Sequence, residues 1–245
     1  NLHVRKENYV SRNFGDKYFT LENARKIGAI RDEIERISQD LTFREKAILI
    51  TSLIYAMDKI ANTCGHYDAY RKKLDTTRSL ELKIPVIRDQ ANVDNEVYRE
   101  DANELVKKIS SDMVYIDTPY NSRQYSDAYH LLENIAEGKK PKVTGVAKKM
   151  ADRSHIKSEY CTINAPKAFD DLIQNIDARF ILVSYNNMAK KGHGRSHAKI
   201  SDEEIMSSLA KRGQVKRFDT DFNYFTTGKT QLKNHKERLF LCEVK

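Results

Sequence analysis

Cysteine is scarce in this sequence, and the three cysteines lie far apart. Cys64, Cys161 and Cys242 form no CxxC pair and no spacing typical of a zinc site. We therefore expect reduced thiols in a cytoplasmic protein rather than a disulfide framework.

Long apolar runs are also absent. No stretch approaches the roughly 18 apolar residues that a membrane-spanning helix needs, and no signal peptide opens the sequence. We therefore expect no membrane association. The first residue is Asn1 rather than methionine, so we expect the sequence to begin partway into a longer protein.

Several catalytic patterns are missing as well. The sequence contains no HExxH helix, no Walker loop, no Gly-x-Ser-x-Gly turn and no Cys–His arrangement typical of nucleophilic catalysis. His193 and His197 have the spacing of two metal ligands on a helix, but the glycines beside His193 disfavour that helix. We expect no metal site and interpret this stretch as a loop that meets phosphate.

Basic residues exceed acidic ones. The 245 residues include 43 Lys and Arg against 35 Asp and Glu, which gives a formal net charge of +8. This balance suits a polyanionic partner such as nucleic acid, although excess lysine also serves solubility alone. Charge leaves both interpretations open.

The amino-terminal part shows a helical pattern after a polar start. Residues 1–19 have no clear period and are interpreted as a linker or surface segment. Apolar residues at steps of three and four predict a helix opened by Thr20, and Thr42 with Glu45 predicts a capping box for a second. The short connection between them predicts a helical hairpin.

A basic stretch with interleaved tyrosines follows the second helix. Tyr67 and Tyr70 lie among five Lys and Arg residues, an arrangement that could track phosphates and stack bases. A solvated loop is the equally weighted alternative. Residues 20–94 are therefore a helical hairpin and basic loop, and a possible DNA-recognition insertion.

Strands alternate with helices over residues 95–245, which predicts a largely parallel sheet with an antiparallel hairpin at one edge. A basic insertion over residues 138–163 interrupts this pattern. The predicted strands are Glu96–Arg99, Met113–Ile116, Arg179–Ser184, Val215–Phe218 and Leu239–Val244. Helices are predicted after Asp101, before Gly138, from Pro166, and between a Ser201–Glu204 capping box and Gly213.

The end of the Met113–Ile116 strand is the strongest candidate for a site. Asp117 supplies a carboxylate, Pro119 fixes a turn whose carbonyl is a second acceptor, and Tyr120 supplies a ring face. Two adjacent acceptors match the two protons of an exocyclic amino group, and stacking of a base on tyrosine contributes roughly 1–3 kcal/mol. These residues predict a site that alkylates the amino group of a flipped nucleobase, although a plain turn remains the alternative.

The stretch Asp117–Asn121 resembles the Asp-Pro-Pro-Tyr signature of the D12 class of DNA adenine-N6 methyltransferases, near the FokI-type methylases of restriction–modification systems. Similarity continues through Ser122–Tyr125 and Tyr129–Ile135, and covers nearly everything from about residue 15 onwards. Other similar stretches are Tyr18–Ala24, Ala61–Gly65, Asp152–Ser154 and Ser184–Asn187.

This resemblance implies a class I methyltransferase with a Rossmann-like sheet, which uses S-adenosylmethionine to methylate double-stranded DNA. Asp117, Pro119 and Tyr120 would hold the target adenine, and Asp101, Ala102 and Asp117 would contact the cofactor. For Asp101, a plain helix cap is the alternative from the residues alone. The remaining substrate-binding candidates are Asn121, Arg123, Tyr125, Ser184, Tyr185 and Asn186.

The sequence departs from the family pattern in two places. Thr118 replaces the usual first proline, and no Phe-x-Gly-x-Gly cofactor turn occurs among the nine glycines. We therefore expect the first βα units to be missing from this sequence. The alternatives are a non-catalytic DNA-binding fragment or the recognition half of a split methylase, and an enzyme that methylates RNA or a protein amide. A restriction endonuclease is a possible partner.

Overall fold

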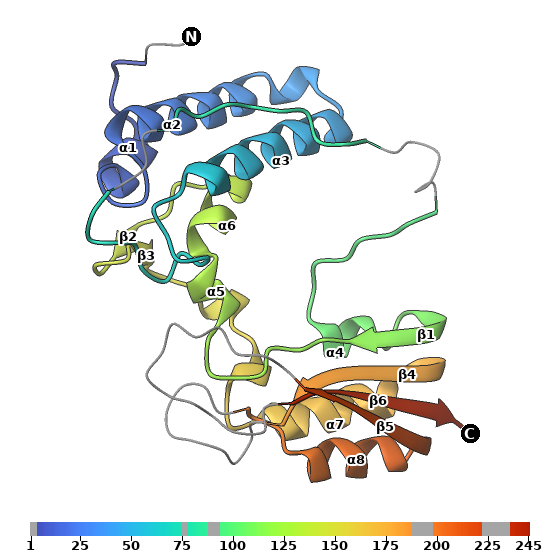
Figure 1. The fold of residues 1–245 in the computed structure, drawn as a ribbon. Coiled ribbons are helices and arrows are strands. Elements are labelled where there is room, and N and C mark those ends of the chain that lie inside the picture. Colours follow the sequence, from blue (N-terminus) through green and yellow to red (C-terminus); the bar gives the residue numbers. More distant parts are fainter. Residues whose placement is uncertain (1–3, 75–77, 88–93, 188–197, 222–235) are drawn as a thin grey trace. The chain divides into compact units, whose positions relative to one another are not determined.

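The computed structural model describes residues 4–74, 78–87, 94–187, 198–221 and 236–245. The chain forms two compact units, whose helices and strands are labelled in Figure 1. The first unit is Asn1–Asp94 with Tyr125–Ile156, and the second is Asn95–Gln124 with Lys157–Lys245. Neither unit is continuous in sequence. The predicted basic insertion at 138–163 is divided between the two units.

The first unit opens with helix α1, Tyr9–Phe14, where the sequence predicted a linker or surface segment over residues 1–19. Asn8 and Ser11 form a capping box, in which Ser11 N donates to Asn8 Oδ1 at 3.0 Å and Asn8 N to Ser11 Oγ at 2.9 Å. Three aromatic side chains of this segment are fully buried: Phe14, Tyr18 and Phe19. The prediction was wrong because these aromatics pack into the core although polar residues surround them in the sequence.

Two longer helices pack in the same core. α2 spans Leu21–Arg36 and α3 spans Phe43–Ile60, and the 3-10 turn Ser38–Asp40 joins them (Figure 1). The predicted capping box of Thr42 and Glu45 is present. Both helices contribute buried residues to one apolar cluster with α1 and α6.

Buried asparagines anchor the basic stretch after α3 to these helices. Asn62 Nδ2 donates to the carbonyls of Lys17 and Arg71, both at 2.9 Å. Asn23 Nδ2 donates to the carbonyl of Arg78 at 2.8 Å. The stretch is therefore tied to the core at separate points.

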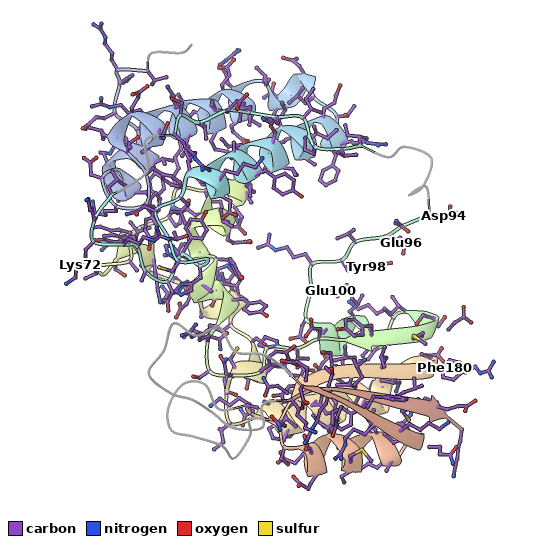
Figure 2. All side chains as sticks on the ribbon, in the orientation of Figure 1. Lys72, Asp94, Glu96, Tyr98, Glu100 and Phe180 are labelled. Carbon is purple, nitrogen blue, oxygen red and sulfur yellow. The ribbon has the colours of Figure 1, made fainter. Side chains whose placement is uncertain are left out.

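The two tyrosines of this stretch serve packing. Tyr67 is 1% exposed and donates to Asp58 Oδ1 at 2.9 Å, so its ring is not accessible to a base. Tyr70 contacts Tyr18 edge to face, with ring centroids 5.2 Å apart. The interpretation of Tyr67 as a stacking residue was wrong, whereas Lys72 is exposed and extends outward (Figure 2).

The second segment of the first unit contains α5 (Tyr125–Ala128), α6 (His130–Glu137) and a hairpin of β2 (Val143–Thr144) and β3 (Lys149–Met150). α6 ends at Gly138 as predicted, and this glycine has φ of 69°, in the left-handed region that favours glycine.

Several cations of the predicted basic insertion are neutralised within the unit. Lys149 forms ion pairs with Asp68 and, at 3.2 Å, with Asp127. Arg153 Nε lies 2.7 Å from Asp127 Oδ1. These two cations therefore serve the packing of the segment rather than a free basic surface.

His130 is a fully buried histidine in this core. Its Nε2 lies 2.8 Å from the Tyr67 carbonyl oxygen, and Nδ1 has no hydrogen-bond partner within the described part of the chain. Burial lowers the pKa of His130 from 6.5 to about 4. The native form is therefore the neutral ring with its proton on Nε2.

We expect the first unit to lose stability as the pH falls from 6.5 towards about 4. The pKa of His130 is lower in the folded than in the unfolded chain, so stability is complete above the unfolded value and decreases below it. His130→Gln should flatten this dependence, whereas His155→Gln, at an exposed position, should preserve it. Urea unfolding between about pH 7.5 and pH 4.5 tests this. Equal pH slopes in wild type and His130→Gln would contradict the expectation.

The second unit contains a mixed four-stranded sheet in the order β1-β4-β6-β5. β1 (Ser110–Ile116) is parallel to β4 (Asp177–Asn186), and β6 (Lys236–Val244) is antiparallel to both β4 and β5 (Gly213–Asp221). The predicted antiparallel pair at the sheet edge is confirmed. The prediction of a largely parallel sheet was wrong for the described strands, because only β1 and β4 pair in parallel.

Helices cover one face of this sheet. α7 (Ala165–Asn175) and α8 (Asp202–Ala210) share a buried apolar cluster with the strands, and the four-residue helix α4 (Ala102–Leu105) lies next to α7 (Figure 1). The predicted Ser201–Glu204 capping box opens α8. The cluster includes Ile116, Ile181, Val183, Tyr185 and Phe240.

The opposite face of the sheet is exposed over several large apolar residues. Their exposed fractions range from 41% to 57%, although they occupy strand positions: Met113, Tyr115, Phe218 and Leu239. β1 also lies at the end of the strand order, with no further strand beside it in the described part of the chain. Among the residues that the structure describes, none covers the large apolar side chains of this face or pairs with the free edge of β1.

One predicted strand and one predicted helix end were wrong. Glu96–Arg99 is not a strand, and Figure 2 shows Glu96, Tyr98 and Glu100 along an extended segment. Every residue of this segment is exposed, so it has no apolar side to bury against a sheet. α8 ends at Ala210, and Gly213 begins β5 instead of closing the helix.

Two kinds of feature are absent from the described ranges. No helix in them is long and apolar enough to cross a membrane, and no group of three or more His, Cys, Asp or Glu could hold a metal ion. The predicted phosphate-meeting loop around His193 and His197 lies outside the described residues.

Candidate active site

The candidate site forms where β1 and β4 end side by side. The strands are parallel, and Ile116 lies opposite Val183 in the register. Asp117 therefore leaves β1 beside Ser184. Parallel neighbouring strands bring their carboxyl ends to the same edge of a sheet, which is where ligands bind in open α/β folds.

Asp117, Tyr120 and Ser184 form a hydrogen-bonded group at this edge. The Tyr120 hydroxyl donates to Asp117 Oδ1 at 3.0 Å, and the Ser184 side chain also hydrogen-bonds to Tyr120. Burial, reinforced by the Asp117 carboxylate, raises the pKa of Tyr120 well above its usual value. The phenol therefore stays protonated and holds the carboxylate, whose side chain is itself exposed.

The turn also supplies carbonyl acceptors. The carbonyl of Tyr120 is occupied, since it accepts from Lys199 N at 2.7 Å and from the Tyr185 hydroxyl at 3.2 Å. The carbonyls of Thr118 and Pro119 accept no hydrogen bond from any residue that the structure describes. One carboxylate and a turn carbonyl can therefore receive the two protons of an amino group.

Tyr185 supports the turn from the buried core of the second unit. Its ring is fully buried and meets the Tyr120 ring edge to face, with centroids 5.2 Å apart and planes at 80°. Its hydroxyl donates to the Tyr120 carbonyl and accepts from Ile200 N at 3.2 Å. Burial raises the pKa of Tyr185 to about 12. This residue acts through Tyr120 as a structural support.

We expect Tyr185→Phe to lower the free energy of unfolding of the second unit by about 1–3 kcal/mol. The change removes one hydroxyl and leaves the buried Ile200 N–H without its acceptor. Tyr115→Phe is the matched control, because the Tyr115 side chain is 57% exposed. Urea unfolding of both variants measures the difference. Equal, negligible losses would show that the hydroxyl bridge does not stabilise the turn.

Residues around Asn186 complete this edge, and sequence reasoning missed most of them. Asn187 N donates to Lys236 O at 3.2 Å, and Lys236 N donates to Asn187 Oδ1 at 3.0 Å. This pair starts β6 and places Glu237 opposite Asn186. The sequence predicted this strand only from Leu239 onwards, because the residues before it are charged.

The loop after the turn is ordered by its own polar groups. Asn121 Oδ1 accepts from Arg123 N at 2.9 Å, and the carbonyl of Arg123 accepts from Cys161 Sγ at 3.3 Å. The side chain of Arg123 is exposed. Tyr125 opens α5 in the first unit, where its ring meets Tyr129 at 5.7 Å.

Asp101 is the N-cap of α4 and accepts from Asn103 N at 2.9 Å. The strand expected before it is missing, so its predicted place at a strand tip was wrong. Asn103 fixes the helix instead, since its Nδ2 donates to Ala168 O at 2.8 Å. Asp101 and Ala102 are both exposed.

A known family matches most of the chain. The model of the D12 class N6 adenine-specific DNA methyltransferases matches residues 2–193, which include the turn at Asp117 and the end of β4. The chain belongs to this family. The predicted resemblance is confirmed.

Several curated relatives of this D12-class chain are modification enzymes. It is 46% identical to the modification methylase StsI of Streptococcus sanguinis over 69% of the chain and 26% of that protein. It is 33% identical to the type II methyltransferase M.NlaIII of Neisseria lactamica over 90% of the chain and 64% of that protein. It is 38% identical to the type II methyltransferase M.FokI of Planomicrobium okeanokoites over 80% of the chain and 29% of that protein.

The D12-class chain thus spans between 26% and 64% of the length of these three relatives. No solved structure matches the chain significantly.

Proposed function

We propose that this D12-class chain carries the acceptor half of an enzyme that transfers a methyl group from S-adenosylmethionine to adenine N6 in double-stranded DNA. The supporting observation is the exposed Asp117 carboxylate at the end of β1, which Tyr120 holds next to turn carbonyls that accept no hydrogen bond from the described residues. Family membership supports the same reaction.

The chemistry of the proposed site rests on orientation and charge. Asp117 and the turn carbonyl accept the two N–H groups of a flipped adenine, which turns the nitrogen lone pair towards the methyl group. The carboxylate then stabilises the positive charge that develops on the amine. Pro119 fixes the turn, and Tyr120 holds the carboxylate and borders the base. No covalent intermediate with the protein is needed.

S-adenosylmethionine, when bound, would supply a sulfonium methyl group to the amine, which would release one proton. The described residues fit only part of this cofactor. Asp101 and Ala102 are exposed and offer a carboxylate. No glycine turn of the family type occurs in the sequence.

We propose a class I methyltransferase fold for the complete protein. The uncovered edge of β1 and the exposed apolar face of the sheet support further βα units beside β1. Those units would carry the missing glycine turn.

DNA contacts are proposed on both units. In the second unit they would come from Asn121, Arg123, Ser184 and Asn186, at the strand ends or in the loop that follows them. The predicted substrate contact of Tyr185 is replaced by a supporting role, because its side chain is fully buried. In the first unit Tyr125 is 59% exposed. Exposed lysines support a recognition role for that unit: Lys72, Lys73 and Lys142. A restriction endonuclease partner and a cytoplasmic location remain part of the proposal.

A second candidate follows from the uncovered sheet face, since a chain without its cofactor half could serve as a DNA-binding recognition half only. Such a chain would bind DNA with a strong salt dependence and transfer nothing.

Methyl transfer from labelled S-adenosylmethionine tests the proposal. The full-length protein is incubated with duplex DNA, RNA or protein, and the DNA is digested to nucleosides. We expect label in N6-methyladenine from duplex DNA. Salt-sensitive DNA binding without transfer would favour the second candidate, and label in RNA or protein alone would exclude DNA as the substrate.

A further inference from the structure

The strand register places one more acid at the edge that carries Asp117. Val183 pairs with Phe240, and Asn186 pairs with Glu237. Val183 and Phe240 are buried on the face covered by helices. Because side chains alternate along a strand, Ser184, Asn186 and Glu237 lie on the opposite face.

Asp117 lies on that same face where it leaves β1. It directly follows Ile116, which is buried on the helix-covered face opposite Val183. The hydrogen-bonded group of Asp117, Tyr120 and Ser184 is consistent with this placement. Asp117 and Glu237 are thus carried by β1 and β6, on either side of β4.

No cation neutralises Glu237 within the described ranges. Its cross-strand neighbours are Asn186 on β4 and Thr220 on β5, and both are neutral. The flanking cations are directed to other acids: Arg238 pairs with Asp219 at 3.5 Å and with Asp202. Lys236 lies 3.8 Å from Asp221.

Among the described residues, the ionisable groups that lie on the same face as Glu237 and influence it are those of the candidate site. The half-buried Glu237 carboxyl has a raised pKa, because of burial and then because of the negative charge of Asp117. Glu237 in turn contributes to the raised pKa of Tyr120. A strand-end glutamate that served only solubility would be exposed, and Asp117 would not affect its pKa.

Resting on the proposed methyl transfer, we propose that Glu237 is a second acid of the acceptor site, whose carboxylate stabilises the positive charge that develops on the target amino group. Asp117 receives the amine directly, and Glu237 acts on it through the electric field. Glu237 is therefore a positioning residue with an electrostatic effect, and its ionised form is the active one.

The first experiment measures the coupling of the two acids without requiring activity. Carboxyl carbon NMR titration of Glu237 is recorded in wild type and in Asp117→Asn. Removing the negative charge should lower the pKa of Glu237, while the carboxyl signal of Glu243 should not respond to the substitution. Glu243 is the matched reference, because it lies on the same face of β6 at the opposite end of the strand, opposite Phe180. An unchanged Glu237 pKa would overturn the proposal.

The second experiment is the pH profile of kcat for methyl transfer by the full-length protein. Glu237→Gln should lower kcat roughly tenfold above the Glu237 pKa and remove the decrease that wild type shows as Glu237 becomes protonated. Glu237→Asp should restore the charge and the acid limb, and Glu243→Gln should resemble wild type. A Glu237→Gln profile equal to that of wild type would overturn the proposal. Absence of transfer by wild type would overturn the proposed function instead, and the NMR coupling would still decide whether the acids share a site.

Discussion

Replacement of Asp117 by Asn is expected to lower the methyl-transfer rate of the full-length protein by about 10²–10³-fold while DNA affinity stays near that of wild type. The amide has nearly the same shape, but it carries no negative charge to stabilise the developing positive charge on the amine. It also presents a donor that competes with the amine protons. Single-turnover transfer from labelled cofactor measures the chemical step, and titration of duplex DNA measures the affinity.

Asp112→Asn is the control for this change. Asp112 lies in the same strand and is exposed, five residues before the candidate site. Its replacement should leave the rate unchanged. Equal rates for wild type and Asp117→Asn would remove the carboxylate from the reaction, and a loss of DNA affinity in parallel with the rate would assign Asp117 to binding alone.

Tyr18→Ala is expected to lower the free energy of unfolding of the first unit by about 3–5 kcal/mol. The Tyr18 ring is fully buried and lies close to the rings of Tyr67, Tyr70 and His130, with centroid distances of 5.2–6.1 Å. Its hydroxyl donates to the Tyr67 or Ala147 carbonyl, both at 2.8 Å. The loss combines a large cavity with the loss of one buried hydroxyl hydrogen bond.

Two further variants separate these contributions. Tyr18→Phe keeps the ring and should cost about 1–3 kcal/mol, which is the part due to the hydroxyl. Tyr55→Ala removes a ring that is 59% exposed and should change stability by no more than about 0.5 kcal/mol. Urea unfolding followed by tyrosine fluorescence gives all three values. A Tyr18→Ala loss as small as that of Tyr55→Ala would show that the ring cluster does not hold the unit together.

The elements that were predicted correctly carry their signal in a few adjacent residues. The capping boxes at Thr42 and Ser201 consist of two residues each, three positions apart. The end of β1 at Ile116 follows from an apolar run that stops at an acid. Local signals of this kind survive folding because the interactions that they describe lie within one turn or one strand.

The features that the sequence did not predict depend on contacts between distant residues. Asn62 joins Lys17 to Arg71, and no local pattern marks an asparagine as the link. Glu237 lies on the same sheet face as Asp117 only because β6 pairs with β4. The predicted strand at Glu96–Arg99 is absent for the reverse reason. Its composition suits a strand, but the segment pairs with no described strand.

The discontinuous first unit has a consequence for exchanging parts between relatives. Leu131 and Ile135 of α6 belong to the same buried cluster as Phe14 and Leu53, although residues 95–124 of the other unit separate them in sequence. A chimera that replaces residues 1–94 alone would join two halves of a core that were not selected together. Both segments, 1–94 and 125–156, have to be transplanted as a pair, with junctions at Asp94, Gln124 and Ile156.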